Sequence, residues 1–459
     1  MSSDEQTMIF SKLNVTLDTE GDNEKCTPSR EDDLPPDGGR TAWLVIFAIF
    51  SINIVQGGYL VSWGVRALSF VNGLKKCSIK AKSCPNFLQT FQAFYETSLL
   101  SKNSPSSIAW IGSIQYALDY TPGLLAGRLL DAGHFRVTLL VSCMALTIAN
   151  FTVPQCREFY QFLLSQAILY GIGSGFLYTP CLAIISHYFD KKRPIAYAIV
   201  TAGGAIGGVL YPIMFRRLEP NIGFPWTMRI FGFFQLVIFV LGVIIIKPRR
   251  SPAANLPKLL HVGGVISSPA YICYAIAIFL AFMALFTPLT FMTVKGINIG
   301  IQPNIAFYLV SIVNAATIPG RIIGGLVANR FGALNLTILT TILSVGFIIG
   351  WAVTESQSVY IGMAICYGIG IGGFLGLFMV PVAQMGNVGD AGRRTGIQMT
   401  ILSIGALIGP PISGAIQEKN SDFTLVGVYA AVIMAASTVL MVIAKRFHVG
   451  KGHLLKGIF

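Results

Sequence analysis

Charged residues are scarce in this sequence. Asp, Glu, Lys and Arg make up 12% of its 459 residues, whereas a soluble globular domain carries about 25%. Ten of the 20 acidic residues fall within the first 40 positions, so the rest of the chain contains very little acid. This composition excludes an ordinary soluble domain. Because the first 40 residues are polar and acidic, we also expect no cleavable signal peptide.

Residue patterns that build metal or catalytic centres are missing as well. The eight cysteines include no C-x-x-C pair, and no cluster of histidines accompanies them, which argues against a metal or redox centre. The sequence also lacks a Walker-type phosphate loop and a recognisable nucleophile–base pair. We therefore expect no cofactor and no enzymatic activity.

Long apolar runs dominate instead, and 53% of the residues are hydrophobic. Each run approaches the ~20 residues that a helix needs to cross the ~30 Å hydrocarbon core of a bilayer. We therefore predict an all-α membrane protein with twelve transmembrane helices in two six-helix bundles. The predicted helices cover residues 42–65, 107–127, 137–154, 159–186, 194–215, 225–246, 268–293, 304–328, 334–353, 358–384, 396–416 and 424–444.

The distribution of basic residues indicates the topology. After position 40 the chain has 29 bases against 10 acids, and the bases gather in alternate loops such as 191–193, 247–258 and 393–394. By the positive-inside rule, these loops and both termini face the cytoplasm. The net charge of +13 then reflects topology and not nucleic-acid binding. We expect a multi-pass protein in the lipid bilayer, in the plasma membrane rather than a vacuolar or other internal membrane, with a monomer as the default state.

The chain divides into two halves that echo each other weakly. Residues 122–135 read PGLLAGRLLDAGHF, and residues 319–332 read PGRIIGGLVANRFG. Repeated halves of this kind are an architecture of transporters, which bind substrate between the halves near the membrane midplane. The predicted organisation is a disordered acidic cytoplasmic tail (1–40), an N-terminal bundle (41–247), a cytoplasmic linker (248–267), a C-terminal bundle (268–446) and a cytoplasmic tail (447–459).

Three short stretches resemble known transporter motifs. GRLLD at 127–131, which ends in Asp131, resembles the helix 2–3 loop of the major facilitator superfamily. PPDGGRTAW at 35–43 and YFDKKRPIAYAIVTAGGAIG at 188–207 resemble the signatures of the monocarboxylate transporter (monocarboxylate porter) family, and the loops resemble its fungal-type branch. The matching positions are Asp37, Gly38, Gly39, Trp43, Tyr188, Phe189, Lys191, Lys192, Arg193, Ala196, Ala202, Gly203 and Gly207, whereas Ala198 and Val200 depart from the pattern.

Most of these signature residues have a structural interpretation. We expect the 188–193 loop to be a basic cytoplasmic anchor with gating contacts, and Gly203 to give its helix a smooth packing face. Asp37 is interpreted either as one partner of a gating ion pair with a cytoplasmic base or as part of a solvated turn.

Arg321 is the main candidate for substrate binding. It lies nine residues before Arg330 in the helix predicted over 304–328, roughly 13 Å deeper along that helix. A charge at membrane depth usually faces a water-filled cavity, and a guanidinium fork suits a carboxylate. The resemblance implies the same role, because an arginine in this helix binds the substrate carboxylate in the monocarboxylate porters. The alternative is an arginine that braces the two halves, through Asn314 or a backbone carbonyl.

Two residues of the proton-coupled porters are absent. Thr317 stands where that family has an aspartate, and Val61 lies near the position of its helix 1 lysine. Proton-linked transport therefore does not follow from the resemblance.

Asp119 is the acid that lies well inside a predicted helix. Burial disfavours the ionised form of a carboxyl group, which suits a proton carrier. We expect Asp119 either to couple proton movement or to pair with Arg321. The alternative is a packing acid that is hydrogen-bonded to Tyr116 or Gln115.

Other polar and aromatic side chains are candidates for the cavity wall. Each polar one, taken alone, is more often an interhelical hydrogen bond than a ligand contact. The further candidates for substrate binding are Asn53, Gln56, Tyr178, Asn314 and Tyr367. A pocket for a bulky, ring-bearing solute is indicated by Phe282, Phe286 and Phe291, with lipid contact as the alternative.

Residues 66–90 interrupt the family pattern with a basic insertion. The segment places five bases in a loop that should face outside, against the positive-inside bias. One interpretation is a retained intron or a gene-model error. The other is a real external loop closed by a Cys77–Cys84 disulfide, which an oxidising exterior permits.

Taken together, these observations predict a secondary active transporter of a small organic solute. A monocarboxylate-like organic anion, moved by alternating access, is the main expectation, and coupling to protons is left open. The alternative is export of a secondary metabolite, or uptake of a larger ring compound such as a vitamin. A non-transporting membrane sensor ranks last.

Overall fold

The computed structural model describes residues 35–61, 94–249, 268–385, 391–419 and 423–449, which are helical and contain no strand. In the first half of the chain the helices are α2 (Arg40–Val61), η2 (Tyr95–Leu99), α5 (Pro105–Tyr120), α6 (Gly123–Asp131), α7 (Phe135–Thr152), η3 (Val153–Gln155), α8 (Phe159–Phe162), η4 (Leu163–Leu169), α9 (Tyr170–Ala183), α10 (Ile185–Tyr188) and α11 (Arg193–Ile245). In the second half they are α13 (Pro269–Asn298), α14 (Pro303–Phe331), α15 (Ala333–Val353), α16 (Gln357–Leu377), α17 (Val380–Gln384), α18 (Ala391–Lys419) and α19 (Phe423–Val449).

The helices agree with the predicted membrane architecture. Ten helical segments of the described residues are long and apolar enough to cross a membrane. One of them, α11, has 53 residues and turns at Gly223, where φ is +76°, a backbone conformation that glycine adopts without strain. It therefore supplies two spans. The consecutive helices α5 and α6 supply a further one, so the structure is consistent with twelve spans.

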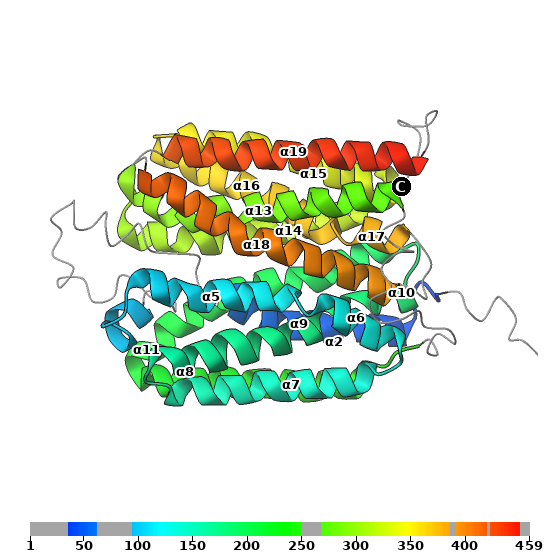
Figure 1. Ribbon diagram of the computed structural model, residues 1–459, viewed down its shortest axis with the longest axis horizontal. Coiled ribbons are helices and arrows are strands. Elements are labelled where there is room, and N and C mark those ends of the chain that lie inside the picture. Colours follow the sequence, from blue (N-terminus) through cyan, green and yellow to red (C-terminus); the bar gives the residue numbers. More distant parts are fainter. Residues whose placement is uncertain (1–34, 62–93, 250–267, 386–390, 420–422, 450–459) are drawn as a thin grey trace, which may run out of the picture. The chain divides into compact units, whose positions relative to one another are not determined.

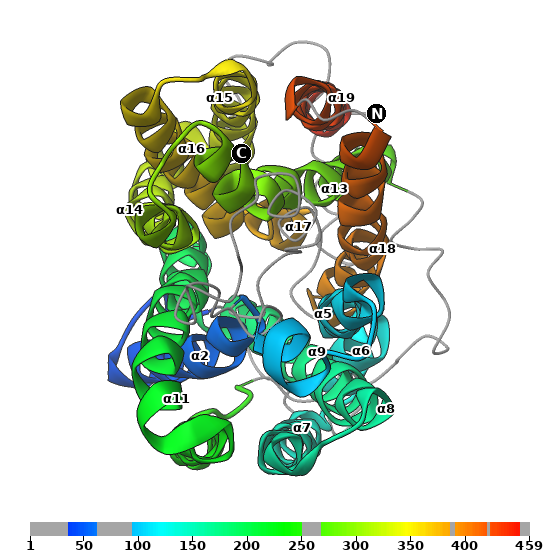
Figure 2. The ribbon, with the colours of Figure 1, turned by 90° about the vertical axis from the view of Figure 1, so that its left-hand side faces the viewer.

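The helices assemble as two groups. Figure 1 shows α13–α19 above α2–α11, and Figure 2 shows the same division from one end. Within the first group α2 packs on α11, and within the second α13 packs on α18 and α19, and α14 on α16. The two groups meet where α11 lies against α14 and where α5 and α6 lie against α18. This arrangement confirms the prediction of an all-α membrane fold with two bundles.

Glycine allows the close packing of α2 on α11. A Cβ atom on Gly207 would collide with the Ile54 carbonyl oxygen, and one on Gly203 with the Phe50 carbonyl oxygen. Small residues of this kind let membrane helices approach closely. The predicted packing role of Gly203 thus has a direct geometric counterpart.

Basic side chains mark one end of the helices. This end contains α6, α10 and α17 (Figure 1), and the positive-inside rule assigns it to the cytoplasm; we call it the cytoplasmic end and the opposite one the outer end. The expectation that Arg393 and Arg394 lie in a loop before a helix at 396 is wrong. Both are buried in the first turn of α18, because Asp131 accepts hydrogen bonds from backbone amides there and extends the helix toward its N-terminus.

Several predictions concern segments outside the described residues. These are the acidic tail up to residue 34, the 66–90 insertion with its Cys77–Cys84 pairing, the linker from residue 250 onward and the tail from residue 450 onward. The boundaries assigned to the two bundles stay predictions.

Candidate functional site

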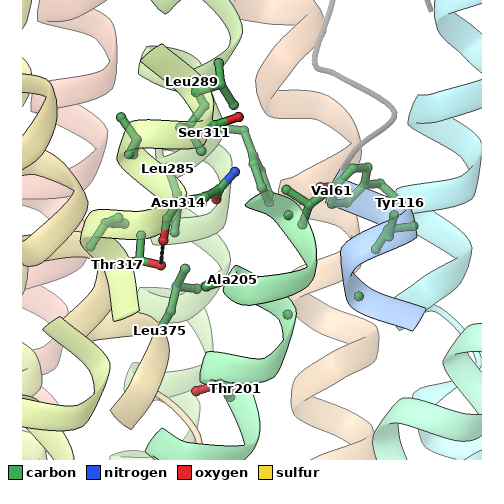
Figure 3. A pocket seen from close by; sticks show the side chains of 18 of the residues that line it. Val61, Tyr116, Thr201, Ala205, Leu285, Leu289, Ser311, Asn314, Thr317 and Leu375 are labelled. Atoms are coloured by element: carbon green, nitrogen blue, oxygen red, sulfur yellow. Dashed lines mark hydrogen bonds between the residues drawn. The ribbon is translucent and has the colours of Figure 1, made fainter. Parts of the chain in front are cut away.

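A cavity lies between the two groups of helices (Figure 3). Its walls come from α2, α5, α9 and α11 on one side and from α13, α14 and α16 on the other. The lining of α11 begins at Thr201 and continues to Pro212, nearer the outer end, and that of α14 runs from Phe307 down to Arg321. The cavity therefore extends from the middle of the bundle toward the outer end, with Arg321 among its deepest residues.

The cavity is large for a short carboxylic acid. Its volume is about 200 Å³, and each water-sized occupant needs about 10–15 Å³ measured in this way. The space is therefore many times the minimum for one water molecule, more than lactate or pyruvate would fill.

Arg321 is buried in α14, with 9% of its surface exposed. Its Nη1 group donates a hydrogen bond to the backbone carbonyl of Thr201 in α11, on the opposite wall. Its Nε–H has no hydrogen-bond partner among the described residues, and no carboxylate there forms an ion pair with it. One part of the guanidinium thus braces the two halves, as the alternative interpretation expected, and the remaining donors are available to an anionic ligand.

Asp119 lies on the same cavity in α5, with 2% of its surface exposed. Its Oδ1 atom accepts a hydrogen bond from Gln56 Nε2 at 3.0 Å and another from Ser174 Oγ. The expected pairing with Arg321 is not observed. Tyr116 and Gln115, named as alternative partners, do not form the hydrogen bonds either. Three helices, α2, α5 and α9, instead enclose the carboxyl group.

Four of the predicted substrate contacts line the cavity, and one does not. The four are Asn53, Gln56, Tyr178 and Asn314. Tyr367 lies elsewhere, because its hydroxyl group turns toward α13 and donates to the Leu285 carbonyl at 2.7 Å. The prediction for Tyr367 as a cavity residue is therefore wrong, and its role is an interhelical hydrogen bond.

Thr317 is the residue at which the resemblance to the proton-coupled porters leads one to expect an aspartate. Its hydroxyl group donates to the carbonyl of Asn314 at 2.8 Å, within its own helix (Figure 3). This position therefore supplies neither a charge nor a titratable proton to the cavity.

Aromatic side chains form much of the wall, and they come from both halves. The rings of Tyr116 and Phe286 lie 5.3 Å apart, and the ring of Tyr120 lies 6.0 Å from Phe282, with edge-to-face geometry in both pairs. Phe282 and Phe286 line the cavity, as predicted. Tyr120 was not among the predicted residues, although its position one residue after Asp119 was an available signal. Phe291 does not line the cavity and contacts Phe423 instead.

The cytoplasmic end of the cavity is sealed by contacts between α6 and α18. The carboxylate of Asp131 accepts from the backbone amides of Gly392 at 3.1 Å and of Arg393 at 2.8 Å. Gly127 packs so closely on the Gly392 carbonyl that a Cβ atom would collide with it. Asp131 thus connects one half to the helix N-terminus of the other, where a negative charge is stabilised.

The two signature stretches fold against each other at the cytoplasmic end of the first half. The Asp37 carboxylate accepts from the backbone amides of Asp190 at 2.5 Å and Lys192 at 3.3 Å, and the Trp43 ring packs edge-on against Phe189 at 5.1 Å. Within the part of the chain that the structure describes, no base forms the expected ion pair with Asp37.

The remaining signature residues brace the same loop. Arg193 pairs with Asp190 at 3.2 Å, Tyr188 donates to the Lys247 carbonyl at 2.5 Å, and Lys191 is exposed. Gly38 and Gly39 have positive φ values of 158° and 92°. Because α2 and α11 belong to one half, these contacts stabilise a loop within that half, and the gating role stays a prediction.

Two helical bundles around a cavity with one sealed end define the class of alternating-access membrane transporters. The chain belongs to the Major Facilitator Superfamily, whose family model matches residues 86–410. This membership confirms a transporter rather than an enzyme.

Individual proteins that are similar to this chain are also named as transporters. The chain is 33% identical to the agnestins efflux protein AgnL12 of Paecilomyces divaricatus, over 81% of this chain and 85% of that protein. It is 29% identical to the MFS transporter asaE of Aspergillus flavus, over 92% of this chain and 91% of that protein. A crystal structure of the human organic anion transporter MFSD10 (TETRAN) superposes with a TM-score of 0.66 at 17% identity, over 89% of this chain and 100% of that chain, and supports the fold.

Proposed function

We propose that the protein exports a ring-bearing organic acid by alternating access and that Arg321 binds the acid group. The observation that carries this proposal is a buried guanidinium on the cavity that has no acidic partner among the described residues. Leaving a charge buried without a counter-ion costs several kcal/mol. An anionic substrate would offset that cost, and a planar carboxylate or enolate suits the fork of donors.

The rest of the cavity favours a larger solute over a short monocarboxylate. The aromatic walls suit a ring, and the volume of about 200 Å³ exceeds the needs of lactate. Relatives named as efflux proteins for agnestins, aspyridones and fujikurins support the export direction. The proposed location is the plasma membrane, with the monomer as transporting unit.

Paired solutes test the role of Arg321. Purified protein in liposomes is offered labelled aryl carboxylic acids, the matching neutral amides, riboflavin-like rings, short monocarboxylates and dicarboxylates. We expect transport of the aryl acid but not of its amide, and a reduction of at least about 10-fold in Arg321→Gln, the loss expected when a hydrogen bond to a charged group is removed. Arg321→Lys should recover part of the activity, because it keeps the charge but lacks the fork.

Either of two results would contradict the proposal. Equal transport of acid and amide would show that charge is not recognised. Unchanged transport in Arg321→Gln would reduce Arg321 to its bond with Thr201. Size-exclusion profiles and melting temperatures of each variant separate a binding defect from misfolding.

A second candidate function is proton-coupled movement of a monocarboxylate-like acid. The coupling is favoured by Asp119, a buried carboxyl group on the same cavity as Arg321, whereas the resemblance to the monocarboxylate porters favours only the acid as substrate. In this proposal Asp119 carries the proton that Thr317 cannot.

Asp119→Asn tests the coupling, because the amide keeps the size of the side chain and removes its titration. We expect the wild type to respond to an imposed proton gradient and the variant to transport at one rate with and without it. Asp119→Glu is the matched control and should retain the response. A gradient response that survives in Asp119→Asn would eliminate Asp119 as the coupling group.

A further inference from the structure

An arginine joins the two halves near the outer end of the cavity. Arg216 lies in α11, fifteen residues beyond Thr201, which is about 22 Å farther along the helix. Its guanidinium carbon lies 5.2 Å from the centre of the Phe307 ring and 5.1 Å from that of Tyr308. Because α11 belongs to the first half and α14 to the second, this contact connects the halves at the end opposite to Asp131.

The chemistry of this contact differs from that of an ion pair. Among the described residues no carboxylate forms an ion pair with Arg216. The two rings are 5.4 Å apart and nearly perpendicular, at 81°, and the guanidinium faces both. A guanidinium is weakly hydrated and stacks well on aromatic rings, and such contacts are modest at partly exposed sites. The contact can therefore break and re-form during a transport cycle.

The position of the contact relates it to access. Phe307 also lines the central cavity, whereas Arg216, Arg217 and Tyr308 border a second hollow. The contact thus stands at the boundary between the central cavity and this second hollow. Ser311, one turn deeper in α14, lines the cavity behind it.

We propose that Arg216, Phe307 and Tyr308 form a releasable latch of the outer gate. In this structure the latch holds the outer ends of α11 and α14 together while the cytoplasmic contacts between α6 and α18 are also formed, and it opens when the outer ends separate to release the solute. The proposal requires alternating access but not any particular substrate, so it stands or fails independently of the role of Arg321.

Thiol labelling from outside measures opening of this gate. Ser311→Cys is introduced into the full-length protein in liposomes, and a membrane-impermeant maleimide is applied. Modification is quantified by mass spectrometry at the peptide that carries residue 311, so the native cysteines do not interfere. We expect Arg216→Ala to raise the labelling rate about 2- to 5-fold, the range for a weak cation–π interaction at a partly exposed site.

Arg217→Ala is the matched control, because it removes the same charge from an adjacent exposed position that has no ring contact in the described residues. It should leave the labelling rate unchanged. Tyr308→Leu removes one ring from the partner helix and should raise the rate even if Arg216→Ala fails to fold. In the Tyr308→Leu background the effect of Arg216→Ala should shrink.

Three results would overturn the latch. These are equal labelling in Arg216→Ala and the parent, an equal effect of Arg217→Ala, and full additivity of Arg216→Ala with Tyr308→Leu. The second would indicate a general effect of charge at the outer end. The third would indicate that the arginine and the ring act separately.

Discussion

The helix pair α5–α6 and its counterpart α14 have similar sequences and opposite chemistry. Each contains a Pro-Gly pair followed by small residues and then a basic cytoplasmic end. In α5 the buried charge is Asp119, three residues before the Pro-Gly pair. In α14 it is Arg321, directly after the pair. The repeated halves therefore preserve the packing and divide the charges, which gives one cavity both an acid and a base.

The two elements also meet their partners differently at the cytoplasmic end. Gly127 of α6 packs on the Gly392 backbone of α18, and Gly325 of α14 packs on Ala198 of α11. Only the α6 contact is reinforced by a buried carboxylate within the described residues, that of Asp131. Near the end of α14, two residues before Phe331, stands Asn329, which is exposed. The contact of α6 with α18, the first seal of the cytoplasmic end, thus relies on close packing and on a charge. The contact of α14 with α11, the second seal, relies mainly on close packing.

Adding a methyl group to the glycine of each seal should have the largest effect on transport and on closure of the cytoplasmic end. Gly127→Ala and Gly325→Ala both force atoms into occupied space, and overpacking of this kind costs about 1–3 kcal/mol. We expect each to reduce transport roughly 10-fold and to expose a reporter cysteine at Thr395 to reagents from the cytoplasmic side. Gly346→Ala is the control, since nothing lies within 4 Å of its Cβ position. A harmless Gly325→Ala would show that the second contact is not a seal.

Removing the charge of Asp131 should have an intermediate effect and should distinguish the two seals. Asp131→Asn weakens hydrogen bonds to a charged acceptor, which are worth about 1.5–3 kcal/mol, so the cytoplasmic end should open more often. The same labelling assay measures the change. Asp190→Asn is the matched control, because its ion pair with Arg193 is 55% exposed on the acid side and such pairs contribute about 0–1 kcal/mol. Equal effects of the two variants would mean that Asp131 is another surface charge.

The smallest effect on stability and on access to the cavity is expected for the contact of Asp37 with the loop before α11, which lies within one half. Asp37→Ala removes the acceptor for two backbone amides next to α11, a loss comparable to that of a helix cap, about 1 kcal/mol. The melting temperature should fall slightly, while access to the cavity from either side stays the same. If Asp37→Ala instead opened the cytoplasmic side, the signature cluster would be a gate after all.

Hydrophobic runs and motifs predicted the helices and several cavity residues, but not their partners. Asn53, Gln56, Tyr178, Asn314 and Arg321 were recognised because polar groups are costly in apolar helices. The partners of Asp119 could not be recognised, because Gln56 and Ser174 lie 63 and 55 residues away in the chain. Tyr367 was misplaced because the direction in which a helix faces depends on its neighbours, and an apolar helix shows no amphipathic pattern to indicate it.

By itself, the sequence determined that the chain spans a membrane as helices, since backbone groups in hydrocarbon must be hydrogen-bonded within the helix. It also indicated that Asp119 and Arg321 are charged positions inside the bundle. The tertiary structure decided which charges meet. Asp131 binds the N-terminus of α18, Asp119 is enclosed by hydrogen bonds within its own half, and Arg321 reaches a carbonyl across the cavity. The pairings of Asp131 and Arg321 depend on how the two halves pack against each other, and that of Asp119 depends on how the helices pack within one half. Side chains distant in the chain become neighbours only after the helices have packed.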